Sequence, residues 1–155
     1  MPKIEIETSP EDLDLGFPLV DNGVYPSTLK FLGMEKAKES GNNMLVFSLA
    51  PQVPVQATIK NPDGTEVRRE IPAGRELFKH RCVLTAKALR SLIELKAALP
   101  SVDAGVTVSE DKRRVSIESE ERLAEFTGQS VRAQIDQRQG NDGNTYNQVK
   151  HILPA

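Results

Sequence analysis

Residues 76–100, ELFKHRCVLTAKALRSLIELKAALP, contain two different periodicities, one after the other. Residues 76–84 show the alternation of a half-buried strand, with apolar or weakly polar side chains at every second position. The second periodicity predicts a helix over residues 85–99, because apolar residues recur at spacings of three and four. Thr85 is a favourable N-cap residue and Pro100 is a favourable stop. A helix is the alternative structure for residues 76–84.

Strands are predicted on the N-terminal side of this stretch. Residues 24–34 and 44–50 alternate apolar and polar side chains, and Ser40-Gly41-Asn42 between them is a turn signal. Residues 55–71 are expected to form a hairpin that reverses at Asn61–Gly64.

Further strands are predicted on its C-terminal side. Residues 105–118 are expected to form a second hairpin, and residues 119–127 a short helical turn. A last hairpin should run from Val131 to Leu153 around the loop Gly140–Asn144. In its return strand, the alternation predicts Val149, His151 and Leu153 on one face, and Tyr146, Gln148, Lys150 and Ile152 on the other.

A helix between the third and fourth main strands is the order of an OB-fold. The fold class predicted from the sequence is therefore mainly β: a five-stranded OB-type barrel with extra hairpins and one central α-helix at residues 85–99. The 155 residues suit one domain of this kind. It is expected to span residues 23–155.

Residues 1–22 are expected to form a flexible acidic arm, with Phe17, Leu19 and Val20 able to hold it against the domain. The arm carries one lysine and six acidic residues, whereas residues 60–96 carry nine basic and five acidic residues. The formal net charge of −2 therefore conceals a basic middle. Such a local basic region attracts phosphates even when the total charge is negative.

The cysteine content and the absence of long apolar runs indicate where in the cell the protein is located. Cys82 is the only cysteine, so no intramolecular disulfide can form and a reducing, cytoplasmic location is expected. No apolar run approaches the roughly 20 residues of a membrane span. The N-terminus has no basic region followed by an apolar stretch, so neither a secretory signal nor a membrane partner is expected.

No catalytic residue, metal site or cofactor is expected. His80 and His151 are the only histidines and are far apart in the sequence, and each stands among apolar neighbours where packing is the commoner role. Cys82 is expected to pack rather than to react. The zinc signatures CxxC and HExxH are absent, as are the glycine-rich nucleotide-binding motifs. A mixed-charge surface explains Glu118, Glu120 and Glu121 better than metal ligation does.

A binding surface follows from the outward faces of the predicted strands. If the apolar faces point inward, four strands place basic or amide side chains outward, with an aromatic residue among them. These residues are Lys30, Lys79, Arg81, Arg132, Gln134, Tyr146, Gln148 and Lys150, and Tyr25 is a second stacking candidate that could equally cap the barrel. Cations follow a phosphate backbone and aromatic rings stack on bases, which favours single-stranded DNA. The alternative is that these side chains only form the polar surface of any sheet.

Three stretches of the chain resemble phage-encoded OB-fold single-stranded DNA-binding proteins. The first begins at Gly23-Val24-Tyr25 and continues through the turn and strand at residues 38–45. The second is Phe78–Leu99, and the third is Leu123–Pro154. Together they cover about two-thirds of the chain in the family's order.

The resemblance implies protection of single-stranded DNA during phage DNA replication or recombination, without sequence specificity. It implies a phage polymerase, helicase or recombinase as partner, and it places Lys30, Lys79, Arg81, Arg132, Tyr146 and Lys150 on or near the DNA. The sequence departs from the family at residues 101–118, which are longer than the usual connection and leave a homodimer open. It also lacks the acidic C-terminal tail of bacterial relatives, so the acidic arm is the candidate to contact partners or to compete with DNA.

The alternative function is an OB-fold protein-interaction module without DNA binding, such as a phage accessory or host-inhibiting factor. It requires an apolar patch on the outside of the sheet. The sequence offers only Leu77 and Ile152 as outward apolar residues for such a patch. A phage structural protein that assembles through β-edges and a nuclease are further alternatives, and the sequence offers no site for a nuclease.

Overall fold

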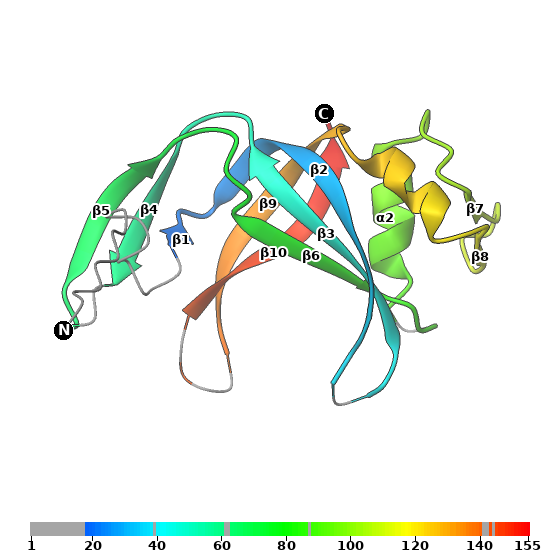
Figure 1. The fold of residues 1–155 in the computed structure, drawn as a ribbon, viewed down its shortest axis with the longest axis horizontal. Coiled ribbons are helices and arrows are strands. Elements are labelled where there is room, and N and C mark those ends of the chain that lie inside the picture. Colours follow the sequence, from blue (N-terminus) through cyan, green and yellow to red (C-terminus); the bar gives the residue numbers. More distant parts are fainter. Residues whose placement is uncertain (1–17, 39, 61–62, 87, 141–142, 144) are drawn as a thin grey trace, which may run out of the picture.

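The computed structural model describes residues 18–155 except residues 39, 61–62, 87, 141–142 and 144. The chain is mainly β with antiparallel sheets (Figure 1). Its elements are β1 (Leu19–Val20), β2 (Gly23–Lys36), β3 (Asn43–Pro51), β4 (Val55–Lys60), β5 (Glu66–Ile71), β6 (Phe78–Val83), α2 (Arg90–Ala98), β7 (Val106–Val108), β8 (Val115–Ile117), η1 (a 3-10 helix, Glu121–Phe126), β9 (Ser130–Gln139) and β10 (Thr145–Pro154).

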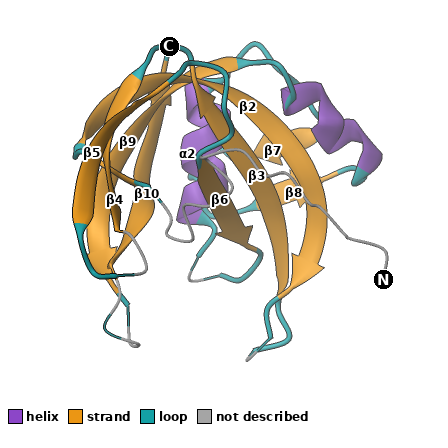
Figure 2. Cartoon of the chain, turned by 60° about the vertical axis from the view of Figure 1, so that its left-hand side comes forward, coloured by secondary structure: helices purple, strands orange, loops and turns teal. Residues whose placement is uncertain are grey.

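Five strands form the main sheet in the order β10-β9-β2-β3-β6, and every neighbouring pair is antiparallel. The sheet curls strongly, so its two edge strands cross near each other (Figures 1 and 2). It does not close into a barrel, because no ladder of hydrogen bonds joins β6 to β10. The mainly-β prediction is confirmed, whereas the closed barrel is not found.

Glu94 of α2 reaches the outer edge of β10, and this contact gives a physical reason why β10 does not pair with β6. The backbone N–H of Ile152 donates to Oε1 of Glu94 at 2.6 Å. Ile152 lies opposite Ala133 of β9, and its N–H on the edge of the sheet is taken by the helix. This N–H is therefore not available to pair with β6.

The core lies inside the curl and is centred on β3. Phe47 is fully buried, with its ring centroid 5.3 Å from that of Phe31 and 6.0 Å from that of Phe126 in an edge-on arrangement. Leu92 and Leu95 of α2 are buried in the same cluster, as the helical stripe predicts. The short helical turn predicted near residues 119–127 is η1, and it contributes Phe126 to this core.

Two smaller sheets flank the main one. The predicted hairpins are confirmed as β4–β5 and β7–β8. β1 adds a third strand beside β4, with Leu19 opposite Thr58 and Val20 opposite Ala57. Val20 is fully buried, so the last part of the predicted arm belongs to the folded unit. Phe17 and the rest of the arm lie outside the described residues.

The helix begins later than the sequence predicts, at Arg90 instead of Thr85. The β3–β6 ladder extends beyond β6, since the Leu84 N–H donates to the Asn43 carbonyl. A tight turn follows, in which the Ala88 N–H donates to the Thr85 carbonyl. Thr85 and Ala88 therefore belong to a turn between the ladder and the helix, and the N-cap is Leu89, without a side-chain cap.

The predicted faces of β10 are wrong beyond Val149. A β-bulge between Val149 and His151 inserts one residue into the strand and reverses the alternation after it. Ile152, predicted to point outward, is 1% exposed and packs in the core, and Val149 packs against the same core. Lys150 lies at the bulge and is exposed.

Cys82 is expected to be inert in the folded protein. Its side chain is fully buried on β6, and burial raises the pKa of the thiol to about 12. The thiolate is the reactive form, so the native protein should not react with a thiol reagent at pH 8, whereas the urea-unfolded protein should react fully. Rapid labelling under native conditions would contradict the packing described for β6.

Candidate nucleic-acid interface

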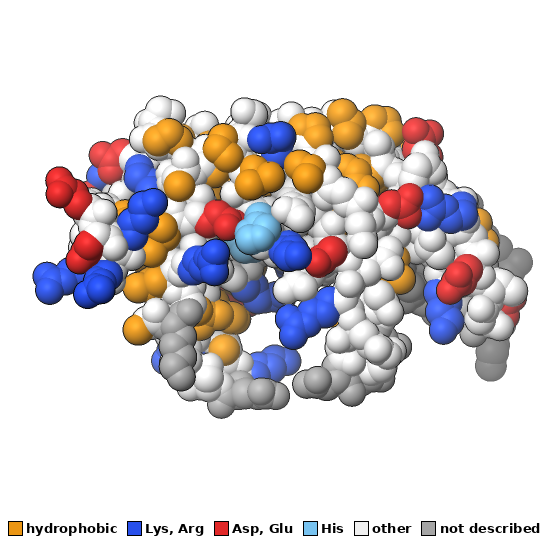
Figure 3. Space-filling model, turned by 180° about the vertical axis from the view of Figure 1, so that it is seen from behind, with side chains coloured by type: hydrophobic (Ala, Val, Ile, Leu, Met, Phe, Trp, Pro, Cys, Tyr) orange, Lys and Arg blue, Asp and Glu red, His pale blue; other side chains and the backbone are white. Residues whose placement is uncertain are grey.

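Two adjoining cavities of about 550 and 580 Å³ lie between the edge strands β6 and β10. Lys79, Arg81 and Asn147 line both of them, and we call the combined space the β6–β10 cleft. Figure 3 shows this side of the molecule, where lysine and arginine side chains surround a hollow.

β6 supplies two cations to the cleft because its residues alternate. Phe78, His80 and Cys82 are buried, and Lys79 and Arg81 between them are exposed. This part of the strand follows the prediction.

Lys30 joins the same surface through the register of three strands. It lies opposite Ser48 on β3, and Ser48 lies opposite Lys79 on β6. The three residues therefore form one row across the sheet. Nζ of Lys30 also lies 3.4 Å from Oε1 of Glu76. Both side chains of this ion pair are about half exposed, so the pair stabilises the fold little and is readily broken.

β10 supplies the opposite wall. Tyr146 is 40% exposed and lines one cavity together with Lys79 and Arg81. Gln148 and Lys150 line the other cavity, again with the two β6 cations. The curl of the sheet therefore brings together five of the predicted residues from strands that are far apart in the sequence.

Lys30 lines neither cavity, and three further predicted residues also lie outside the cleft. Arg132 donates from Nε to the Pro154 carbonyl at 2.8 Å, at the open end of the β9–β10 hairpin, far from its loop. Gln134 lies on β9 opposite His151. Tyr25 caps the core: its ring stacks on that of Phe78 with centroids 6.4 Å apart, and its hydroxyl donates to the Asp21 carbonyl.

The surroundings of Tyr25 also hold its hydroxyl in the neutral form. Burial raises the pKa of Tyr25, and the nearby Asp21 carboxylate raises it further. Asp21 itself is bound by both terminal nitrogens of Arg68 at 2.7 Å, which lowers the pKa of the carboxyl group. Of the two positions that the sequence left open for Tyr25, the structure shows the one in which the ring caps the core.

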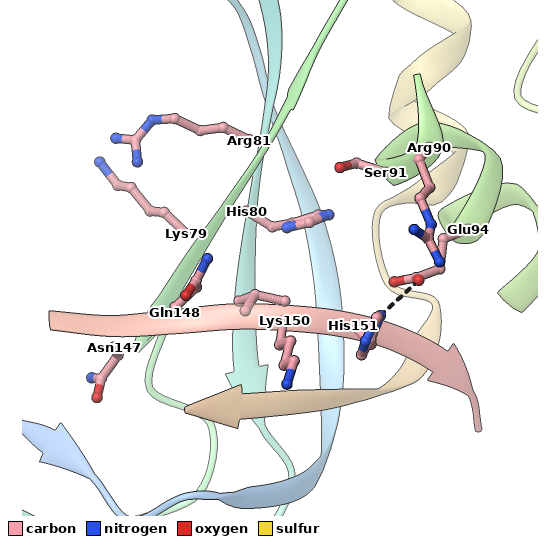
Figure 4. Close-up of a pocket in the computed structure, with 11 residues that line it drawn as sticks. Lys79, His80, Arg81, Arg90, Ser91, Glu94, Asn147, Gln148, Lys150 and His151 are labelled. Carbon is pink, nitrogen blue, oxygen red and sulfur yellow. Dashed lines mark hydrogen bonds and ion pairs between the residues drawn. The ribbon is translucent and has the colours of Figure 1, made fainter. Parts of the chain in front are cut away.

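α2 contributes residues that sequence reasoning missed. Arg90, Ser91 and Glu94 project from the helix into the cleft, beside Lys150 and His151 of β10 (Figure 4). Arg90 and Glu94 have the four-residue spacing of one helix face, which the sequence shows. The direction of that face depends on how the helix docks, so no sequence pattern could place it on β10.

Glu94 is the acidic residue in the cavity of about 550 Å³, and both of its carboxylate oxygens already have partners. Glu94 accepts the Ile152 N–H through Oε1, and its Oε2 lies 2.9 Å from Nδ1 of His151. Four basic side chains line the same cavity. The side chains around this cavity therefore favour binding of an anion. Among the described residues, no group of three or more histidine, cysteine or acidic side chains is placed to hold a metal ion.

The apolar patch required by the alternative function is not formed by the two residues predicted for it. Ile152 is buried because of the β10 bulge, and Leu77 packs against the core. In the described part of the chain, no helix is long and apolar enough to cross a bilayer.

Comparison of the sequence with protein-family models and with curated proteins finds no match.

Proposed function

We propose that this protein binds single-stranded DNA without sequence specificity, through the β6–β10 cleft of an OB-type sheet. The observation that carries the proposal is the meeting of Lys79 and Arg81 with Tyr146, Gln148 and Lys150 across the open edge of the sheet. Cations, amides and an exposed aromatic ring within one cleft are the groups that bind an unpaired strand.

The strand order supports an OB-type architecture. Numbered along the chain, the five strands β2, β3, β6, β9 and β10 are arranged 5-4-1-2-3, with α2 between the third and the fourth. OB-folds are partly open barrels that bind oligonucleotides on strands two and three and on the loops between strands one and two and strands four and five. Here those strands are β3 and β6, and the ends of the β2–β3 and β9–β10 hairpins project from the same side of the sheet (Figure 2).

The chemistry of the cleft suits the backbone more than the sequence of a strand. Lys79, Arg81 and Lys150 offer charge to phosphates, and Gln148 can hydrogen-bond to sugars or bases. Tyr146 provides one stacking surface, worth about 1–3 kcal/mol per base. With one such platform, most of the affinity must come from phosphate contacts.

Binding is therefore expected to fall steeply with salt. Fluorescence anisotropy with a labelled oligo-dT should show saturable binding at low salt, and the affinity should decrease linearly with salt on logarithmic axes. A duplex of the same length serves as the control and should bind more weakly, since the described residues include no basic recognition helix. Absence of oligo-dT binding at low salt would sink the proposal.

The acidic N-terminal segment is expected to compete with DNA. Pro18 lines the cleft, and its carbonyl accepts the side-chain amide of Asn147 at 2.7 Å. The described part of the chain therefore begins at the edge of a basic surface, and the segment 1–17 that precedes it carries five acidic residues. Deleting residues 1–17 should tighten oligo-dT binding severalfold at low salt, and the difference should shrink as salt screens the charges.

The deletion must stop before residue 18. Removing residues 1–22 would also remove buried Val20 and the Asp21–Arg68 ion pair, and would confuse lost stability with changed affinity. A full-length control with the five acidic residues changed to their amides should reproduce the gain. Equal affinity of the deletion, the amide variant and the parent chain would reject competition by the arm.

A further inference from the structure

The part of the cleft beneath α2 has features that a general polar surface does not require. We call it the α2 pocket, and its walls are His80 of β6, Arg90, Ser91 and Glu94 of α2, and Lys150 and His151 of β10 (Figure 4). It belongs to the cavity of about 550 Å³ and therefore has room for a group larger than a water molecule.

His80 is the first of these features. The residue is only 8% exposed, yet it lines the cavity, and its Nε2 is buried without a hydrogen-bond partner among the described residues. Buried polar atoms are nearly always hydrogen-bonded, because an unpaired one loses its contact with water and gains nothing in return. His80 nevertheless forms part of the wall, so a charged group bound in the pocket would lie next to its ring.

The charges around His80 indicate which ligand this is. Arg90 of α2 and Lys150 of β10 both line the cavity, whereas both oxygens of Glu94, the acidic residue in the wall, are occupied by Ile152 and His151. The pocket also lies beside the N-terminal half of α2, whose dipole favours negative charge. All of these features favour an anion with several acceptor oxygens.

We propose that the α2 pocket holds a phosphate group of the bound strand, with Arg90 and Lys150 neutralising its charge and the His80 ring beside it. This inference rests on the proposed function and adds a defined subsite to it. An internal phosphodiester and a terminal phosphomonoester share this chemistry, so the experiment must distinguish between them.

Phosphate binding should be linked to protonation of His80. Burial lowers the pKa of His80 in the free protein, and the opposing effect of Glu94 is smaller. The other titratable or charged groups that line the cavity are Lys79 and Arg81 on β6, Arg90 on α2, and Lys150 and His151 on β10. A bound phosphate adds negative charge next to the ring and should therefore raise the pKa of His80.

The test uses the full chain and NMR titration of its two imidazole rings. A His151→Gln variant assigns the two signals. Saturating unmodified dT12 should raise the pKa of His80 by about one unit if an internal phosphodiester occupies the pocket. If the rise is seen only with dT12 carrying a 5′- or 3′-phosphate, the occupant is the chain end.

Affinity measurements give a second readout. Arg90→Gln should weaken binding of the effective oligonucleotide about tenfold. The matched control is Arg113→Gln, which removes an exposed arginine from the connection between β7 and β8 and should bind like the parent. Because the NMR titration needs no change at His80, it remains decisive if a His80 variant fails to fold.

The two proposals fail in different ways. Tight oligonucleotide binding with an unchanged His80 pKa for all three oligonucleotides, and with Arg90→Gln equal to Arg113→Gln, would overturn the phosphate pocket and leave the proposed function standing. Failure of every oligonucleotide to bind at low salt would overturn both.

Discussion

Changing Lys79 and Arg81 to glutamate together is expected to weaken binding of oligo-dT by roughly tenfold or more at low salt. Both side chains are exposed on β6 and line both cavities of the cleft. The double change replaces two attractive charges with two repulsive ones at the centre of the proposed DNA path. It should also make the affinity less sensitive to salt, because fewer counterions are released when the strand binds.

A matched control is available in the same chain. Arg113 and Arg114 are adjacent, exposed residues in the connection between β7 and β8, outside the lining of the cleft. Changing both to glutamate alters the net charge by the same amount, so it measures the long-range effect alone. If the two double variants bind oligo-dT equally well, the DNA path does not run along β6.

Replacing Phe47 with alanine is expected to lower the free energy of unfolding by about 3–5 kcal/mol. Phe47 is fully buried at the centre of the main sheet and packs against the rings of Phe31 and Phe126. The change removes a large apolar surface and leaves a cavity that β3, held between β2 and β6, cannot close. A loss of this size is a large part of the stability of an ordinary domain.

Urea unfolding followed by circular dichroism measures this loss. Val67→Ala is the control, because Val67 is 47% exposed on β5 and its truncation should cost less than about 0.5 kcal/mol. If Phe47→Ala cost no more than this control, the aromatic cluster would not be the centre of the core. Where enough Phe47→Ala remains folded, its oligo-dT affinity should match the parent, since Phe47 lines neither cavity of the cleft.

The amino-acid sequence by itself determined the elements and most of their faces. Alternation placed Lys79 and Arg81 on the outside of β6, and the spacing of Leu92 and Leu95 defined the buried side of α2. These predictions succeeded because a strand has a period of two and a helix a period of 3.6, so the pattern of one segment suffices.

Only the tertiary structure decided how those faces meet. The bulge in β10 buried Ile152 against the pattern of its own strand. The curl of the sheet set Tyr146 opposite Lys79, and docking of α2 put Arg90 above His80. Each outcome depends on contacts between segments far apart in the chain, where packing and hydrogen bonding outweigh the local preference of either segment.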